Sequence, residues 1–336
     1  MRYVLTVAVV LTLLTCVGIW RLADHDLDRR LSEPFNFTSD GVSIYGTLWL
    51  PNVEPAAIVV FVHGDGPQDR TSDGRYAPLI NAFLDRGIAV AAWDKPGVGA
   101  SEGNWLLQSM SDRTEEARAG LAQLSVRFNG VARGAVGFSQ AGWVLPALTP
   151  DDADFIVLIG AAVSWQNQGD YYTRMRLSAE GLDPRQIKET LAKQEEEDER
   201  IFGADAVDDD RPDRMPVDRW NFIRQNRTAD ATDDLVHLDI PLLAIWGADD
   251  LNVDAQRNAI KYEELLPQND AHSQVVVWPD ATHSLLKSDR YNWQLTEDWS
   301  WFAMARFLAE GRYAYASGAI DVINNWIAPM ITESEH

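Results

Sequence analysis

The sequence predicts an α/β fold in which helices flank a mostly parallel sheet and a helical insert interrupts the chain. Three observations predict it. Short, nearly uninterrupted apolar runs recur along the chain, and such runs are typical of strands buried on both faces of a parallel sheet. Amphipathic helical segments alternate with several of these runs, as right-handed crossovers require. One long stretch, residues 165–235, is charged and helical in pattern and contains no such run.

Composition limits the possible functions. The chain has 336 residues, 46% hydrophobic and 24% charged, which is enough apolar material for a large core. Its formal net charge of −22 repels phosphate backbones and anionic lipid headgroups, so nucleic-acid binding is not expected. The only cysteine is Cys16, so the body has no disulfide framework, no cysteine-based zinc site and no thiol nucleophile.

The N-terminus carries the longest apolar run. Residues 3–20 hold no charged side chain, and these eighteen residues reach the lower bound for spanning a bilayer. No Ala-x-Ala cleavage site follows, so residues 1–21 are interpreted as an apolar helix that serves as a signal or membrane anchor, with a buried core helix as the alternative. Lipidation at Cys16 is disfavoured because a bulky threonine precedes it. The flanking arginines favour a cytoplasmic body, whereas the export-like N-terminus favours export, which we expect.

The remaining elements follow in order. Charged residues 22–34 look like a linker, and residues 35–51 are expected to form two strands joined by a turn at Ser39-Asp40-Gly41. The apolar runs expected to form the parallel sheet are residues 58–62, 88–93, 135–138, 155–159, 242–246 and 275–278. The clearest helix spans residues 112–128, behind a cap at Ser111 and Asp112.

The insert divides one domain into two parts, expected over residues 35–164 and 236–336. Residues 165–235 between them look like a lid. The acidic run at 195–200 is expected to be a solvated helix face. The aromatic side chains of the insert are interpreted as local core rather than as substrate contacts.

Two serines compete for the role of nucleophile. Ser101 lies in a literal G-x-S-x-G motif, and Ser139 lies in the relaxed version GFSQAG. A nucleophile elbow requires a strand that runs into a sharp turn and then a helix, with small residues beside the serine. Ser139 follows the run at 135–138 and has Gly137 and Ala141 as small neighbours, whereas Ser101 ends a glycine-rich coil. The pattern therefore favours Ser139.

A serine hydroxyl needs a base, which on such a sheet comes after the acid in chain order. His283 follows the strand that ends at Trp278, and chemistry on open α/β sheets gathers at the carboxyl ends of strands. His237 and His272 precede strands and so lie at the wrong end. His283 is therefore the predicted base.

The base in turn needs a carboxylate that holds its tautomer. The run at 242–246 leads into Gly247, and one of the two aspartates that follow should reach His283. Asp250 is favoured by its position three residues beyond the glycine, Asp249 remains a live alternative, and Asp280 is a remote one. The aspartate that does not serve is expected to form a turn.

An oxyanion requires two backbone N–H donors. The first is expected from Gln140, directly after the nucleophile. The second is expected from Asp65, in the glycine-containing loop 63–66 after the run at 58–62. An ordinary tight turn is the alternative for this loop.

Five stretches together resemble the α/β-hydrolase superfamily: HGDGPQDR at 63–70, WDKPGVGAS at 93–101, GFSQAG at 137–142, GADD at 247–250 and DATH at 280–283. The first stretch resembles the bacterial carboxylesterase group with a helical lid and an HGxGPQDR-type oxyanion loop. The likeness spans about residues 35–310 and implies neither a metal nor an organic cofactor. The chain departs from the pattern at Ala141, where glycine is commoner, and at Pro96-Gly97, where Arg-Gly is usual, which leaves the role of Lys95 open.

These observations predict a carboxylic-ester hydrolase that acts on small-molecule esters through an acyl-enzyme on Ser139. A peptidase or an acyltransferase would use the same triad, and the sequence excludes neither. A catalytically silent binding protein on the same fold is the alternative from a different class.

Overall fold

The computed structural model describes residues 18, 21–267 and 272–333. Its centre is an eight-stranded sheet with the order β1-β2-β4-β3-β5-β6-β7-β8. The strands are β1 (Leu31–Ser39), β2 (Val42–Leu50), β3 (Ala57–Val62), β4 (Ile88–Trp93), β5 (Ala132–Phe138), β6 (Phe155–Ile159), β7 (Leu242–Gly247) and β8 (Gln274–Trp278). β2 pairs antiparallel with β1 and β4, and all other pairings are parallel. The predicted α/β class is confirmed.

Burial explains why the apolar runs form central strands. Every residue of β3, β4 and β7 is buried. In β3, Ile58, Val60 and Val62 belong to the core on one face of the sheet, and Val59 and Phe61 belong to the core on the other. All six runs expected as strands are strands, and the expected hairpin is formed by β1 and β2.

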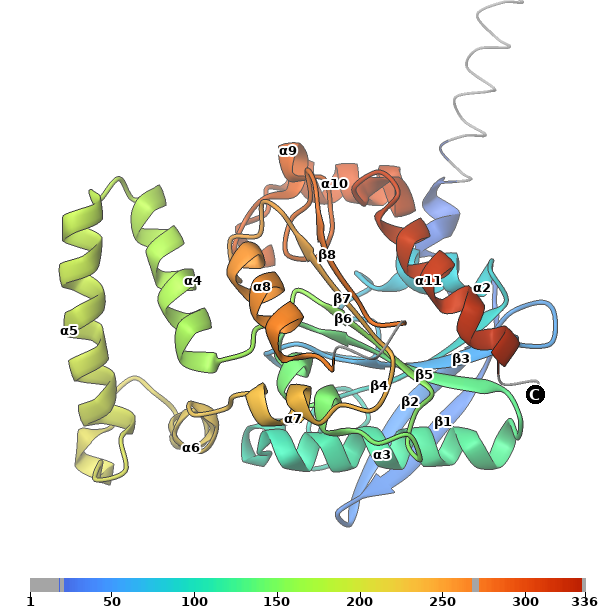
Figure 1. The fold of residues 1–336 in the computed structure, drawn as a ribbon, viewed down its shortest axis with the longest axis horizontal. Coiled ribbons are helices and arrows are strands. Elements are labelled where there is room, and N and C mark those ends of the chain that lie inside the picture. Colours follow the sequence, from blue (N-terminus) through green and yellow to red (C-terminus); the bar gives the residue numbers. More distant parts are fainter. Residues whose placement is uncertain (1–17, 19–20, 268–271, 334–336) are drawn as a thin grey trace, which may run out of the picture.

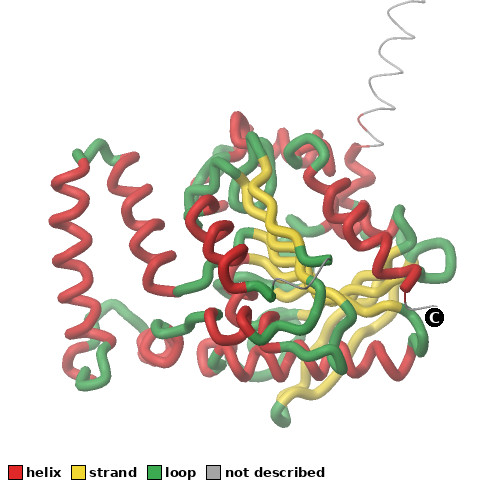
Figure 2. The backbone as a smooth tube through the Cα atoms, in the orientation of Figure 1, coloured by secondary structure: helices red, strands yellow, loops and turns green. Residues whose placement is uncertain are grey.

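Helices cover both faces of this sheet (Figures 1 and 2). They are α2 (Ala77–Leu84), α3 (Met110–Arg127), α8 (Ala255–Leu265), α9 (Ser288–Tyr291), α10 (Trp301–Glu310) and α11 (Ala319–Glu333). Leu121 of α3 and Tyr262 of α8 are buried in one core, whereas Phe83 of α2 and Ile327 of α11 are buried in the other. The sheet is therefore the middle layer of three.

Two local predictions were wrong in detail. α3 begins at Met110 with Ser109 as its cap, because Ser109 and Asp112 satisfy each other's backbone N–H groups in a capping box, which makes Asp112 the third helical residue. The segment after Ser139 forms two short 3₁₀ turns, Ser139–Trp143 and Leu145–Ala147, rather than one helix. Pro146 lies in the second turn and lacks the N–H that a continuous helix would use.

The segment before β1 packs on the domain. The sequence predicts a linker over residues 22–34, but β1 begins at Leu31 and Asp24 is buried, where it accepts hydrogen bonds from the Arg312 guanidinium. An acidic side chain is buried here because a guanidinium pairs with it. Of the predicted apolar anchor, residues 3–20, all but Gly18 lie outside the described residues. None of the described helices has the length and apolar character that a bilayer crossing requires.

The insert between β6 and β7 is helical, as predicted. It holds α4 (Trp165–Ala179), α5 (Pro184–Phe202), α6 (Val217–Asn226) and α7 (Thr232–Val236). α4 and α5 form an antiparallel pair beside the sheet domain (Figure 1). In the acidic run at 195–200 only Asp198 is half-buried and the other side chains are exposed. Trp220 and Phe222 are fully buried, whereas Trp165 is half-buried and stacks on Trp143 with ring centroids 5.2 Å apart.

Candidate active site

A cavity of about 1080 Å³ lies where the loops that follow the parallel strands meet the helical insert. Ser139 after β5 and His283 after β8 both line it. The loop after β3 contributes residues 64–68, and the insert contributes side chains of α4, α5 and α6. The sequence-predicted nucleophile and base, far apart in the chain, therefore face one cavity.

Ser139 lies at a strained turn. Its φ is +50°, in the left-handed region that residues with a side chain rarely adopt. The turn is tight enough that a Cβ at Gly137 would lie 2.7 Å from the Cβ of Ala141, so glycine is required there. Ala141 itself is fully buried, so its methyl group is accommodated at the position where the resembling family has glycine. This geometry fits a nucleophile elbow.

His283 is held by a carboxylate. Its Nδ1 lies 2.7 Å from Oδ2 of Asp250, and since a carboxylate can only accept, Nδ1–H donates and Nε2 is left with its lone pair. The backbone of Gly160 passes directly beneath the ring, where a Cβ would lie 2.8 Å from Cε1. Burial acts to lower the pKa of His283, but the charge and hydrogen bond of Asp250 act against it and the pKa is raised above 6.5.

Asp250 is itself tightly bound. It is 2% exposed, and its Oδ1 accepts hydrogen bonds from the N–H groups of Asn252 at 2.7 Å and Val253 at 2.9 Å. The Tyr171 hydroxyl of the insert donates to the Asp250 carbonyl at 2.8 Å. Oδ1 is thus held by two backbone N–H groups, which leaves Oδ2 oriented towards His283.

The two alternative acids contact other groups. Asp249 is exposed, and its Oδ2 accepts a hydrogen bond from the Ser288 hydroxyl at 2.6 Å. Asp280 is exposed at a turn with φ of +51°, and its carbonyl accepts from the Ser288 N–H. Of the three candidates, Asp250 is the one with a hydrogen bond to His283.

Ser101 is buried away from the cavity. Its hydroxyl donates to the Asp94 carbonyl at 2.7 Å and accepts from the Tyr45 N–H at 2.9 Å. It thereby joins the glycine-rich coil to β2. The literal G-x-S-x-G motif is a structural turn.

Two buried cations hold the loop after β3, and sequence reasoning missed their role. The Lys95 ammonium donates to the carbonyl groups of Gly64 at 2.5 Å and Gly66 at 3.0 Å. The Arg113 guanidinium donates to the His63 carbonyl at 2.6 Å and to the Gln140 side chain at 2.5 Å. In a trans peptide group the N–H points opposite to the carbonyl group. Because Lys95 binds the Gly64 carbonyl, the N–H of Asp65 in the same peptide group points away from Lys95.

The surroundings of Lys95 change its pKa. Burial lowers the pKa of Lys95 well below its usual range, and the nearby Arg113 lowers it further, whereas Asp65 and Glu116 act to raise it. The sequence did contain a pattern that could have revealed the role of Arg113. Arg113 falls on the apolar side of α3, between Met110 and Ala117. A charge at such a position indicates a buried partner.

Two other residues of the motifs, His63 and Arg70, support the loops. His63 is buried, its Nε2 lies 2.6 Å from the Trp93 carbonyl, and burial lowers its pKa to about 3, so it stays neutral and is not placed to act as a base. Arg70 binds the Asp94 carboxylate through two nitrogens at 2.9 and 2.6 Å. This pair joins the loop after β3 to the loop after β4.

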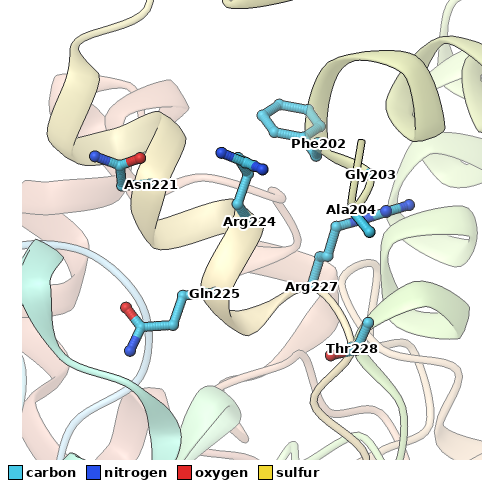
Figure 3. Close-up of a pocket in the computed structure, with 8 residues that line it drawn as sticks. All are labelled: Phe202, Gly203, Ala204, Asn221, Arg224, Gln225, Arg227 and Thr228. Atoms are coloured by element: carbon cyan, nitrogen blue, oxygen red, sulfur yellow. The ribbon is translucent and has the colours of Figure 1, made fainter. Parts of the chain in front are cut away.

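A second, smaller hollow of about 370 Å³ lies within the insert (Figure 3). It lies between the end of α5, at Phe202–Ala204, and α6 with the turn that follows it. Neither Ser139 nor His283 lines it. In the part of the chain that the structure describes, no group of three or more His, Cys, Asp or Glu side chains could hold a metal ion.

Comparison with solved structures supports the fold. An esterase from Pyrococcus furiosus matches at a TM-score of 0.54 with 14% identity, covering 89% of this chain and 91% of that one. Est1E from Butyrivibrio proteoclasticus, solved with ferulic acid, matches at 0.54 with 13% identity over 89% and 98%. A proline iminopeptidase from Mycobacterium smegmatis matches at 0.53 with 14% identity over 90% and 100%. At these identities the likeness concerns the fold alone.

A curated sequence relative is an uncharacterized abhydrolase domain-containing protein of Dictyostelium discoideum, 38% identical over 66 residues. Those residues are 20% of this chain and only 7% of that relative.

The match to a family model and the fold together define a serine hydrolase of the α/β-hydrolase superfamily. Residues 53–290 match the family model described as serine aminopeptidase, S33, and the chain belongs to that family.

Proposed function

We propose that the protein hydrolyses carboxylic esters through an acyl-enzyme intermediate. Ser139 attacks the acyl carbonyl, His283 Nε2 takes its proton and returns it to the leaving alcohol, and Asp250 holds the imidazole and stabilises the imidazolium. Water activated by the same His283 then releases the acid. No cofactor enters these steps.

One observation carries this proposal: the 2.7 Å hydrogen bond between His283 Nδ1 and Asp250 in the cavity that Ser139 also lines. It leaves the Nε2 lone pair as the acceptor that a serine hydroxyl needs. The strained turn at Ser139 supports the same role, because strain persists at positions that the surrounding structure holds for function.

The oxyanion hole is proposed to consist of the backbone N–H groups of Asp65 and Gln140. Gln140 follows the nucleophile at the start of a 3₁₀ turn, where the first N–H groups have no partner within the turn. Lys95 and Arg113 support the other side by holding the carbonyl groups of the loop that contains Asp65. Two such donors would stabilise the negative charge of the tetrahedral intermediate.

Residues 165–235 are proposed to act as a lid that shapes the substrate site. Trp165 and Tyr172 of α4 line the cavity, and Arg219 of α6 lies 3.3 Å from the Asp65 carboxylate, so the insert reaches the loop after β3. The insert therefore gives the cavity both an aromatic and a charged wall.

An N-terminal membrane anchor and an exported domain are also proposed, from residues 3–20. This support comes from the sequence, since a run without charge is favourable in a bilayer. Protease treatment of sealed cells that express the full chain tests the side of the membrane. An exported domain is cleaved from outside, and a protected one would contradict export.

A fluorophosphonate probe tests the catalytic proposal directly. The probe should label the full chain, and peptide mass mapping should find the adduct on Ser139, whereas Ser139→Ala should remain unlabelled. Parallel panels of p-nitrophenyl esters and aminoacyl anilides then separate esterase from peptidase activity. Turnover confined to anilides would replace the ester proposal by a peptidase, and absence of any labelling would indicate a silent binding protein.

A further inference from the structure

Exposed apolar side chains gather in one stretch of the chain. Among the described residues, seven of the seventeen exposed large hydrophobic side chains fall between residues 293 and 313, and the rest are scattered along the chain. These seven form what we call the aromatic face: Trp293, Leu295, Trp301, Phe302, Met304, Leu308 and Tyr313. Trp301 is 81% exposed and Phe302 55%. Single exposed hydrophobic side chains are ordinary, but a cluster of this size indicates a partner.

Helix α10 forms the centre of the aromatic face. It is buried only at Ala303 and Phe307, and its two charged residues are Arg306 and Glu310. The guanidinium of Arg306 lies over the Phe302 ring at 4.8 Å, and Glu310 pairs with an arginine outside the helix, so neither charge interrupts the apolar surface. A helix with one anchored side and an aromatic outer side is typical of helices that lie in a membrane interface.

The chain enters the domain beside this face. The His25 ring packs edge-on against Phe307 with centroids 5.0 Å apart, and its Nε2 lies 3.2 Å from the Phe307 carbonyl. The Arg21 guanidinium lies 4.9 Å from the centre of the Tyr313 ring. In Figure 1 this first described segment lies near α10 and α11, at the edge of the molecule opposite α3. The uncharged residues 3–20 therefore join the domain next to the aromatic face.

Building on the membrane anchor proposed for residues 3–20, we propose that the aromatic face lies in the interface of the same lipid bilayer. Tryptophan and tyrosine are enriched at that depth, because their rings are apolar and their N–H or O–H groups stay hydrated. Since the chain carries a net charge of −22, contact with the bilayer depends on apolar burial and not on attraction to anionic headgroups.

The aromatic face also borders the cavity. Leu295 belongs to the face and lines the cavity, and Trp299 and Phe307, which are not part of the face, line the cavity as well. Trp299 packs against Phe307 with ring centroids 5.7 Å apart and against Trp293 at 6.3 Å, so the face and the cavity wall are continuous. A bilayer against the aromatic face thus lies at the rim of the cavity.

Spin labels on the full chain, reconstituted into phosphatidylcholine vesicles, test this placement. The only cysteine is first replaced by Cys16→Ser, and a single label is then introduced by Ala305→Cys, an exposed position of α10 that leaves all seven hydrophobic side chains in place. Val126→Cys, 85% exposed on α3, is the matched control. We expect the label at 305 to be roughly tenfold less accessible to an aqueous nickel relaxing agent than the label at 126, as burial in the headgroup boundary requires.

The double variant Trp301→Ser, Phe302→Ser shows whether the face itself causes the protection. In that background the accessibility at 305 should rise towards that at 126, while circular dichroism shows an unchanged fold. Equal accessibility at the two labels in the unaltered face would overturn the proposal, as would a full chain that fails to float with the vesicles. Spin–spin broadening at 305 would overturn it too, because it would mean that a second copy of the chain covers the face.

Discussion

Replacement of the buried acid offers the most discriminating test of the proposed chemistry. In Asp250→Asn the side-chain oxygen can keep the two hydrogen bonds from the N–H groups of Asn252 and Val253, which fixes the orientation of the amide. The amide NH₂ then occupies the position of Oδ2 and faces His283 Nδ1, 2.7 Å away in the unaltered protein. Two donors cannot face each other, so His283 would shift its proton to Nε2.

The expected magnitude follows from this tautomer. With the proton on Nε2, His283 cannot accept the Ser139 proton, and nothing stabilises the imidazolium of the transition state. The comparable change in serine proteases lowers kcat by about 10⁴-fold, or about 5 kcal/mol. KM should change little, because Asp250 does not itself line the cavity.

The control is Asp249→Asn, which removes the same charge from the neighbouring residue. Its carboxylate is exposed and bonds the Ser288 hydroxyl, a contact that an amide oxygen can keep. We expect its kcat to stay within about twofold, by the usual size of such surface changes. The assay is steady-state hydrolysis of a water-soluble p-nitrophenyl ester, with folding checked by circular dichroism. A dead Asp249→Asn and a mild Asp250→Asn would refute the assignment of the acid.

The pH profile adds a second readout. The active form of His283 is neutral, so activity is present above its pKa and is lost as the pH falls through it. Because Asp250 raises that pKa, the midpoint of the acid limb in the unaltered enzyme should lie above 6.5. In Asp250→Asn the carboxylate is gone and burial remains, so the residual activity should have its midpoint at a lower pH. An unshifted midpoint would mean that His283 is not the titrating base.

Four further substitutions test the rest of the site. Ser139→Ala should lower kcat by a thousandfold or more in the ester assay, by the usual cost of losing a nucleophile; substantial remaining turnover would exclude it as nucleophile. Ser101→Ala should keep most of the activity but lower the free energy of unfolding by about 1–3 kcal/mol in urea titrations, because the part-buried Tyr45 N–H loses its acceptor. Lys95→Met should lower kcat by roughly ten- to a hundredfold, less than loss of an oxyanion donor, and an unchanged kcat would contradict its support of the oxyanion loop. Gly160→Ala should also reduce kcat, since its Cβ would lie 2.8 Å from His283 Cε1; unchanged kinetics would show that the ring can move freely.

Uninterrupted apolar runs in the sequence were sufficient to predict the buried strands of the sheet. Each buried strand is an uninterrupted apolar run, because a strand covered on both faces meets only apolar side chains. The same local reasoning favoured Ser139 over Ser101, since an elbow depends on the elements directly beside it. The start of α3 was predicted wrongly: the cap was expected at Ser111 and Asp112, whereas Ser109 is the cap and forms a capping box with Asp112.

Local reasoning favoured the acid without excluding its neighbour. The position of Asp250 three residues after the glycine that ends β7 favoured it. Asp249 is adjacent, however, and spacing alone does not tell which carboxylate points towards His283. The choice depends on how the loop after β7 folds, and there the N–H groups of Asn252 and Val253 orient one carboxylate inwards. The loop after β7 and the loop after β8, which carry Asp250 and His283, meet only in the folded chain.

The sequence by itself predicted the fold class, the strands in their order along the chain, and the serine and histidine that face one cavity, because each of these depends on a local pattern. Tertiary structure alone decided which acid contacts His283, and it showed that Lys95 and Arg113 converge on the loop after β3. It also showed that the chain's entry and α10 share one surface, although they are far apart in sequence. Side chains with no local relation meet only when the sheet folds, and their partners cannot be read from spacing along the chain.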